Sequence, residues 1–593
     1  MYQRLRKPNI EKMAIQQISI DDSYKPFDLA NIQGYNPIYG RFFDMNAENY
    51  NLVALNHIYQ VADLHTLVDQ DGKKVKKDVF VKFSPLLDPL KFITGKYNFK
   101  DPRTIALPSL DASACSTKIG NVNNCSYTDA FFSYLSNMLL EKHGFVHGVP
   151  FYGSALAIQN RFRFNVADDL DFVKDSDFFM NNMGKHCTLD ENAEALLRDF
   201  SGSGSRTNRQ KISIMDAVDA DIETIDIIDF NTPSEEILKD ALLEYEKVDN
   251  TNNVDKEDKE DKDDDDKENN SDKDDDDDSS GSSCSDETED EEEEGNGEKD
   301  EEKDGEKDEE KDEEKDEEKD EEKDGENEDS DWETDSSSEM DKEEPVYCYL
   351  HDFPVQMIFQ ERCDGTFDEL LMQKTFGQEE LIAGLFQIIM ILLTYQKAFD
   401  FTHNDLHTNN IMFVHTDESH INYCFENTWY RVPTYGRIYK LIDFGRAIYR
   451  YQDKTFCSDS FAPNGDAYSQ YNCEPFLNES KPRLEPNYSF DLCRLGCSLY
   501  DFVSDEIKDR DADELIKKWC SDDDDKNVVY KKNGQERYPN FKLYKMIART
   551  VHNHVPKNQL SSPVFSAFIN IKKQDVDGIS VNIDAIPKYK MKQ

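Results

Sequence analysis

Apolar side chains recur along the chain with two spacings, which predict two kinds of structural element. Residues 126–144 carry them at helical intervals and end on Gly144, a common helix stop, so we expect a helix there. The longer run LIAGLFQIIMILLTYQ predicts a helix over 378–399. This run is shorter than the about 20 apolar residues of a bilayer span, and it contains Gln387. We therefore expect a buried core helix and no membrane segment.

Shorter apolar stretches bounded by turn residues predict strands. We expect strands within 51–68 and 76–84, separated by the turn sequence DQDGKK, and another over 353–363. The sequence IYKLIDFG (438–445) predicts a strand that ends in a turn, and residues 489–503 predict a further helix. Strands and helices in this order predict a mixed α+β fold.

Charge is distributed unevenly and sets one segment apart. Of the formal net charge of −55, residues 255–344 carry −40, from 53 acidic and 13 basic side chains. Trp332 is the only aromatic residue of this acidic insert, which cannot bury enough apolar surface to offset its conformational entropy. We expect disorder, with a single solvated helix of EEKD repeats as the alternative. Its charge would attract basic proteins and not nucleic acid.

The cysteines indicate the compartment. All 12 are scattered singly without a CxxC pair, and the N-terminal MYQRLRKPNIEKMA is not a secretory leader. Free thiols fit a reducing environment. We expect a soluble, cytoplasmic protein.

Candidate chemistry lies just after the predicted long helix, in FDFTHNDLHTNNIMF (399–413). His403, Asp405 and Asn410 each fit an ordinary turn or capping residue. A second acidic turn, at Asp443, also borders an apolar strand and can face the first across one cleft. Phosphoryl transfer uses such groups, because Mg²⁺ selects carboxylate and amide oxygens and a further carboxylate orients the attacking hydroxyl.

These two motifs, H-x-D-x-x-x-x-N and D-F-G, resemble the catalytic loop and metal-binding turn of the protein-kinase family. The resemblance covers roughly 34–160 and 345–505. It implies a small β-rich lobe and a large helical lobe with ATP and Mg²⁺ between them. NPIYGRFFDMN and HGFVHGVPFYGSALAI are most similar to divergent serine/threonine kinases of large DNA viruses, including giant viruses, which would place the protein in host cytoplasm or the virion.

The resemblance assigns a role to each candidate residue. It makes Asp405 the catalytic base, and it makes Asn410 and Asp443 the Mg²⁺ ligands. His403 becomes a structural member of the loop, whose backbone Asp491 would hold. The remaining assignments concern the nucleotide: Lys82 would bind phosphate with Asp129 rather than Glu141 as its acidic partner, backbone groups of Glu361 and Cys363 would meet adenine, and Gly34 and Gly40 would bound the nucleotide loop.

The alternative for Lys82 is a solvated lysine at a strand edge. On the kinase alignment the chain divides into five parts: an N-terminal extension (1–33), the first part of the small lobe (34–254), the acidic insert (255–344), the last small-lobe strand with the hinge (345–363) and the large lobe (364–593).

Several positions depart from the kinase pattern. Asn404 replaces the usual arginine, which removes the link from the catalytic loop to a phosphorylated activation segment. His407 replaces a lysine, as in aminoglycoside and choline phosphotransferases. The stretch GYNPIYG is not G-x-G-x-x-G, and no A-P-E follows D-F-G. Asp443 lies 38 positions after Asp405, which predicts an elongated hairpin around ESHINYCFENTWYRVPTYG.

Three functions remain in competition. The first is ATP-dependent phosphorylation of Ser/Thr hydroxyls in protein substrates. The second is phosphorylation of a small molecule, which His407 favours. The third is a catalytically weak acidic scaffold (a pseudokinase), which would need none of Lys82, Asp405, Asn410 and Asp443.

Overall fold

The computed structural model describes residues 2–4, 8–17, 24–167, 169–174, 176–190, 346–373, 376–506, 510–569 and 576–590. All of them belong to one compact unit. The acidic insert lies outside the described residues. Disorder and a single solvated helix therefore both stay predictions for it. Within the described residues the fold is a mixed α+β fold, as the sequence predicts.

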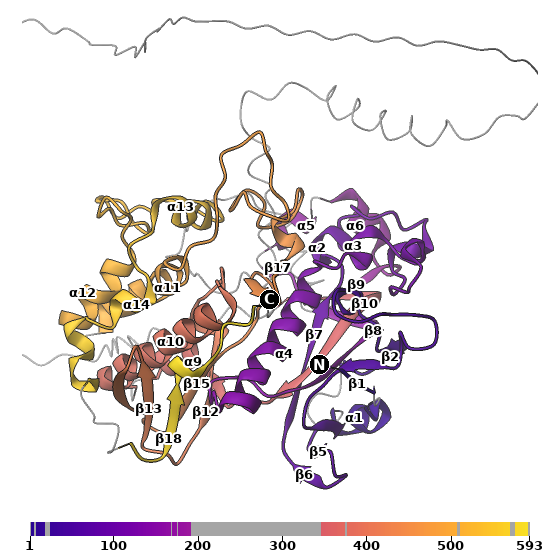
Figure 1. Ribbon diagram of the computed structural model, residues 1–593. Coiled ribbons are helices and arrows are strands. Elements are labelled where there is room, and N and C mark those ends of the chain that lie inside the picture. The colour runs from indigo at the N-terminus through magenta and orange to yellow at the C-terminus, as the bar shows by residue number, and fades with distance from the viewer. Residues whose placement is uncertain are drawn as a thin grey trace, which may run out of the picture. The chain divides into compact units, whose positions relative to one another are not determined.

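An antiparallel sheet organises the N-terminal part (Figure 1). Strand β10 returns after residue 345 and lies between two strands from much earlier in the chain, as its colour in Figure 1 shows. The boundary predicted at residue 34 falls just after a strand of this same sheet. In order across the sheet, the strands are β2 (Leu29–Gln33), β8 (Phe151–Asn165), β10 (Tyr347–Glu361) and β7 (Val79–Pro85), with β9 (Cys187–Leu189) also paired to β10.

The predicted strand region 51–68 contains three short strands instead of one. Asp63 causes one break, because its carboxylate accepts from the N–H of His65 and closes a turn. The predicted turn DQDGKK does connect two strands. The strands are β3 (Val53–Leu55), β4 (Gln60–Asp63), β5 (Thr66–Val68) and β6 (Lys74–Lys76); β4, β5 and β6 form a small sheet, and β3 pairs with β1 (Tyr2–Arg4).

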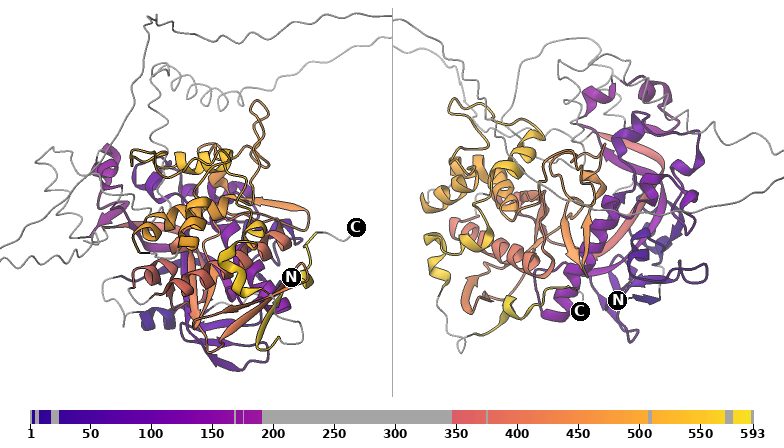
Figure 2. Two further views of the ribbon diagram at one scale, coloured as in Figure 1. Left: turned by 90° about the vertical axis from the view of Figure 1, so that its left-hand side faces the viewer. Right: turned by 45° about the horizontal axis from the view of Figure 1, so that its top comes forward.

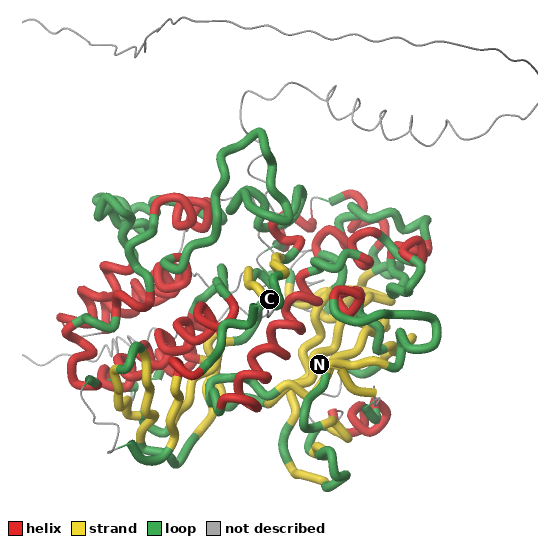
Figure 3. Tube along the Cα trace, viewed as in Figure 1, coloured by secondary structure: helices red, strands yellow, loops and turns green. Residues whose placement is uncertain are grey.

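Helix α4 (Cys125–His143) packs against β8 and β10 (Figure 3). Its residues 126–139 are buried. The Asn124 side chain caps its first turn by accepting from the N–H of Ser126. Gly144 ends it in the left-handed region at φ 64°, as the sequence predicts. Shorter helices flank the sheet: α1 (Ile10–Gln17), α2 (Pro89–Ile93), α3 (Thr117–Gly120), α5 (Leu170–Lys174) and α6 (Asp177–Asn182).

Helix α10 (Gln378–Phe399) is the core of the C-terminal part and matches its predicted limits. Within the described residues it alone is long and apolar enough to cross a membrane, but 89% of its most apolar window is buried inside the protein. That burial fits a core helix. The other helices are α9 (Phe367–Leu371), α11 (Phe490–Glu506), α12 (Arg510–Trp519), α13 (Lys542–Thr550) and α14 (Pro556–Gln559).

The predicted elongated hairpin is present. Its strands, β13 (His420–Phe425) and β14 (Thr428–Pro433), join through Glu426 and Asn427, both with positive φ, as a tight hairpin turn requires. A second hairpin, formed by β16 (Ile448–Tyr451) and β17 (Lys454–Cys457), lies beside α4 (Figure 2, right). The ring centroids of Phe456 and Phe131 are 5.0 Å apart. The C-terminal strands are β11 (Gly365–Thr366), β12 (Ile411–His415), β13 (His420–Phe425), β14 (Thr428–Pro433), β15 (Arg437–Leu441), β16 (Ile448–Tyr451), β17 (Lys454–Cys457) and β18 (Ile579–Asn582).

Candidate active site

Three predicted residues from distant segments meet at one point. The Lys82 ammonium on β7 lies 2.8 Å from Asp129 Oδ2 on α4 and 3.0 Å from Asp443 Oδ1, just after β15. Asp129 Oδ1 also accepts from the N–H of Phe444 at 2.9 Å. Asp129 therefore ties both the lysine and the D-F-G turn to α4. Glu141, the alternative partner, instead contacts Asn137 and the N–H of Ile58.

The charges of this cluster depend on one another. Burial lowers the pKa of Lys82, but the two carboxylates raise it more strongly, so its net pKa is above the usual value. Desolvation raises the pKa of Asp443, but the Lys82 ammonium lowers it to about 2. Burial raises the pKa of Asp129. The Asp443 side chain is still 46% exposed and the Lys82 side chain 27%, so both can reach a ligand.

The loop that carries Asp405 is held by its backbone. The carboxylate of Asp491, at the start of α11, accepts from the N–H groups of His403 (2.9 and 3.1 Å) and Asn404 (2.9 Å). His403 contacts the carbonyl of Ile442 through Nε2 at 2.9 Å. His403 thus joins the two motifs structurally, and Asp491 is where the resemblance expects it.

Asn404 explains one departure from the kinase pattern. Its φ of 63° is left-handed, a conformation that asparagine tolerates better than most residues. The side chain is fully buried, donates to the carbonyl of Arg446 at 3.0 Å and accepts from the Tyr471 hydroxyl at 2.8 Å. Asn404 therefore fastens the loop to the segment that follows D-F-G through neutral hydrogen bonds.

Asp405 lies in a nearly closed setting, with its side chain 12% exposed. The Tyr544 hydroxyl donates to Oδ1 at 2.7 Å, and Arg446 Nη1 lies 3.5 Å from Oδ2. Burial raises the pKa of Asp405, but Arg446, His407, Arg494 and the hydrogen bond from Tyr544 together lower it below its usual value. The carboxylate is therefore ionised and can accept a hydrogen bond from a hydroxyl.

Asn410 and His407 stand next to Asp405. The Asn410 amide donates to the carbonyl of Asp405 at 2.9 Å and contacts His407 Nε2 at 3.1 Å. Burial lowers the pKa of His407 to about 4, so the ring is neutral at pH 7. His407 Nδ1 is buried without a hydrogen-bond partner among the described residues. Since the Asn410 nitrogen is used, its oxygen is the atom left for a metal ion.

One backbone group of the two predicted adenine-binding residues, Glu361 and Cys363, already has a partner. The N–H of Glu361 donates to the carbonyl of Pro150 at 3.0 Å and is not available to a base. Its carboxylate pairs with Lys77 at 2.5 Å and with the buried Lys440 at 2.8 Å. Cys363 is half-buried, and burial raises the pKa of its thiol to about 12. The Glu361 carboxylate thus holds β10 to neighbouring segments.

The predicted glycine loop gains no support from the geometry. Residues Pro37–Arg41 form a 3₁₀ helix, η1, where a nucleotide loop would be a turn between strands. A Cβ added at Gly40 would meet no heavy atom within 4 Å, and the φ of Gly40 is not positive, so a larger residue would fit there. Gly34 donates its N–H to Asn51 Oδ1 at 2.9 Å. Nothing at Gly40 requires glycine.

Metal ligands are sparse. Across the described ranges, no group of three or more His, Cys, Asp or Glu side chains converges to hold an ion. Mg²⁺ in nucleotide sites keeps several waters and takes only one or two protein ligands besides phosphate. The Asn410 amide oxygen and the Asp443 carboxylate are hard oxygen donors of the right kind, so the residues fit an ion that arrives with a nucleotide.

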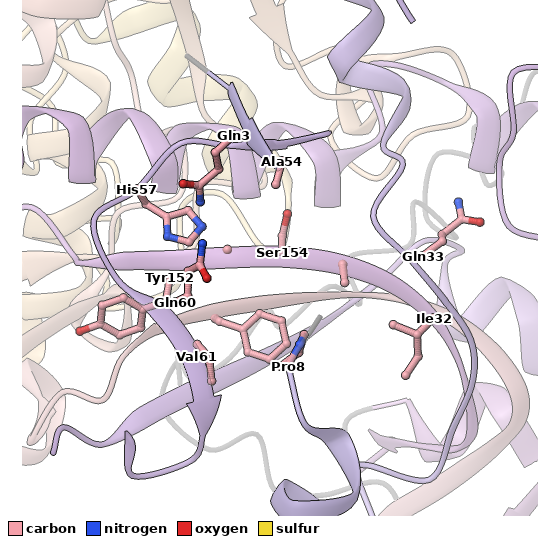
Figure 4. Close-up of a pocket in the computed structure, with 13 residues that line it drawn as sticks. Gln3, Pro8, Ile32, Gln33, Ala54, His57, Gln60, Val61, Tyr152 and Ser154 are labelled. Carbon is pink, nitrogen blue, oxygen red and sulfur yellow. The ribbon is translucent and has the colours of Figure 1, made fainter. Parts of the chain in front are cut away.

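A cavity elsewhere in the N-terminal part contains none of the predicted site residues (Figure 4). His57, Gln60, Tyr152 and Ser154 are among the residues that line it, beside β8. Burial lowers the pKa of His57 to about 4, so the cavity has a neutral lining. It offers no charge for a phosphate.

Sequence reasoning missed three residues around Asp405. Arg446 follows D-F-G directly, so its position was readable from the motif. Arg494 lies on α11 one turn after Asp491, on the same helical face. Tyr544 comes from α13, 139 residues after Asp405, and carries no sequence signal.

No protein-family model matches the chain, and no curated protein matches it with significance.

Proposed function

We propose that the protein is an ATP-dependent kinase that phosphorylates Ser/Thr hydroxyls of protein substrates. One observation carries the proposal: Lys82, Asp129 and Asp443 converge from three segments, and the loop of Asp405 and Asn410 is fastened to the same D-F-G turn. A purely structural ion pair between Lys82 and Asp129 would need neither the third charged group, Asp443, nor the partial exposure of Lys82 and Asp443. The convergence is what phosphate binding requires.

The fold supports a two-lobed assignment. The antiparallel sheet with α4 would be the small lobe, and the part built on α10 would be the large lobe. Strand β10 leads through residues 362–364 directly into the second part, so these residues would be the hinge. The nucleotide would lie between the two lobes, next to Lys82.

Phe80 offers a surface for the base. It lies two positions before Lys82 on β7, so its side chain is on the same face of the sheet, and it is 48% exposed. An exposed aromatic ring beside a phosphate-binding lysine can stack on a purine. Phe80 would thus bind the base by apolar contact, whereas the N–H of Glu361 cannot bind it because that N–H already donates to Pro150.

The transfer step follows from the groups present. The acceptor oxygen forms a bond to the γ-phosphorus while the bond from that phosphorus to the β,γ-bridging oxygen breaks, and ADP leaves. Asp405 accepts the hydroxyl proton through its carboxylate. Lys82 neutralises phosphate charge, and Asn410 holds the Asp405 backbone. Mg²⁺, held by Asn410 and Asp443, would supply further charge neutralisation on the phosphates.

A small-molecule acceptor is the second candidate. The Asp405 side chain is only 12% exposed, and a helix of the C-terminal part, α13, reaches it. A narrow approach favours a small hydroxyl compound, and His407 points the same way by resemblance. The test must therefore include both acceptor classes.

The test is to incubate the full chain with labelled ATP, Mg²⁺ and a panel of basic proteins, acidic proteins, sugars and amino alcohols. We expect label on protein serine or threonine. Asp405→Asn should lower transfer by about 100-fold or more while ATP binding is kept, whereas Asp443→Asn should weaken Mg²⁺-dependent ATP binding. Equal transfer by the Asp405→Asn variant and the parent would overturn the assignment.

A further inference from the structure

Tyr544 occupies a position that no motif predicts, at hydrogen-bond distance from the group proposed to accept the proton. It lies on α13, is 4% exposed, and packs against Phe541 with ring centroids 5.3 Å apart. Its hydroxyl reaches Asp405 Oδ1 at 2.7 Å. A buried tyrosine hydroxyl needs a partner, but this one has two.

The second partner determines the direction of the hydrogen bonds. Arg494 Nε lies 2.8 Å from the Tyr544 oxygen. Arginine can only donate, and an ionised carboxylate can only accept. The Tyr544 hydroxyl therefore accepts from Arg494 and gives its single proton to Asp405. The chain Arg494 to Tyr544 to Asp405 has one possible polarity.

Arg494 has little else to bind. It is 2% exposed, and its Nη1 has no hydrogen-bond partner among the described residues. A buried guanidinium stays charged, so it requires a compensating anion nearby. Asp405, on the far side of the Tyr544 hydroxyl, is such an anion. Arg494 and Asp405 thus stabilise each other's charged form through Tyr544.

The two carboxylate oxygens of Asp405 are consequently unequal. Oδ1 is committed to Tyr544 at 2.7 Å, whereas Oδ2 has Arg446 Nη1 at 3.5 Å, beyond a normal hydrogen-bond length. Arg446 itself is drawn away by Asp466, at 3.0 Å from Nη2. Oδ2 is therefore the oxygen with capacity to accept a further hydrogen bond.

We infer that Tyr544, backed by Arg494, is a positioning residue that fixes the rotation of the Asp405 carboxylate, so that Oδ2 meets the acceptor hydroxyl. This inference rests on the proposed phosphoryl transfer and adds to it which oxygen acts and what orients it. A carboxylate locked in one rotation needs no reorganisation during the reaction. The C-terminal helix α13 is thereby part of the catalytic geometry.

The experiment compares Tyr544→Phe with the parent full chain in steady-state kinetics. The variant keeps the ring and loses only the hydroxyl. We expect kcat to fall about tenfold, as for loss of one hydrogen bond to a charged group, with the KM for ATP unchanged. In the Asp405→Asn background, Tyr544→Phe should have no further effect, because the bond it removes no longer positions a carboxylate.

Tyr423→Phe is the matched control. Its hydroxyl is also buried and bonded at 2.7 Å, but its partner, His147 Nε2, does not belong to the candidate active site. It should lose thermal stability to a similar extent and keep its kcat. A fall in kcat for both variants would assign the effect to general destabilisation and overturn the positioning role.

The remaining outcomes separate the two proposals. An active parent whose kcat is unchanged by Tyr544→Phe would overturn the positioning role alone. A rise in kcat would also overturn it and show that Tyr544 blocks the acceptor site. A parent inert toward every acceptor would overturn the proposed function, and the positioning role with it.

Discussion

His147 is a fully buried side chain to which the sequence analysis assigns no role. Its two ring nitrogens contact the carbonyl of Tyr439 and the hydroxyl of Tyr423, both at 2.7 Å. Burial lowers its pKa to about 3. The ring is therefore neutral in the folded protein at neutral pH. Its two contacts join β15 to β13.

This setting predicts a pH-dependent stability. Because the folded pKa is below the unfolded value of about 6.5, the unfolded chain takes up the proton first as pH falls. The stability from His147 is fully present above pH 6.5 and is lost as pH decreases toward 3. At pH 5 the loss is on the order of 2 kcal/mol.

Thermal unfolding midpoints at pH 7.5 and pH 5 check this prediction. The midpoint of His147→Gln should fall less between the two pH values than that of the parent. His415→Gln, a change at an exposed histidine, should follow the parent. An identical fall for His147→Gln and the parent would mean that other groups carry the acid sensitivity.

The segment from β16 to residue 466 is attached to α3 and α4 by an ion pair and a hydrogen bond. Asp459 is the centre of this attachment: its carboxylate lies 2.8 Å from Lys118 and accepts from the N–H of Cys125 at 3.1 Å. Cys125 is the first residue of α4, so the carboxylate also lies at the positive end of that helix. Arg41 adds a bond to the carbonyl of Thr455.

Activity should accordingly be independent of phosphorylation on this segment. Phosphatase treatment should leave kcat within about twofold, because Asn404 provides no cation for a phosphate. Asp459→Asn should lower kcat/KM about tenfold, since it leaves the Lys118 charge without its partner and loosens the contact to the helix that carries Asp129.

The matched control is Glu426→Gln, which removes the exposed ion pair with Lys557 and should change little. Hydrogen exchange of residues 454–464 should increase in Asp459→Asn and stay unchanged in the control. The prediction would be wrong if phosphatase treatment greatly lowered activity while Asp459→Asn left kcat/KM unchanged. Activity would then depend on a phosphate and not on the contacts of Asp459.

At the level of the entire chain, two residues that flank segment 191–345, Asp190 and Tyr347, lie side by side. The N–H of Asp190 donates to the carbonyl of Tyr347, and the N–H of Tyr347 donates to Asp190 Oδ2, both at 3.1 Å. A short hairpin loop can join residues so placed. The segment is therefore an insertion between two paired strands, and long loops there cost little, roughly 0.6 kcal/mol for each doubling.

Replacing 255–344 with a short Gly/Ser linker should leave phosphorylation of a small acceptor nearly unchanged. It should weaken binding to basic proteins at low salt, and the difference should vanish as salt rises, because charge interactions are screened beyond about 10 Å at 0.1 M. Titration of both chains with a basic protein at several salt concentrations measures this. Loss of folding in the shortened chain would place the insert within the catalytic domain.

The sequence alone determined the features that depend on neighbouring residues. The limits of α10 and the end of α4 at Gly144 follow from local periodicity and backbone preference, and so does the β13–β14 hairpin. The order of the two acidic motifs was also readable, because each is a short pattern beside an apolar strand.

Which distant groups meet depends on how the elements pack together. The kinase resemblance favoured Asp129 over Glu141 on the same helix, but it is sheet register and helix docking that bring Asp129 to Lys82. The glycine stretch stays a prediction, because its local pattern says nothing about where η1 packs. Tyr544 contacts Asp405 across 139 residues, and a hydrogen bond of that kind leaves no periodicity in the sequence. Packing, which no short window of sequence encodes, determined these contacts.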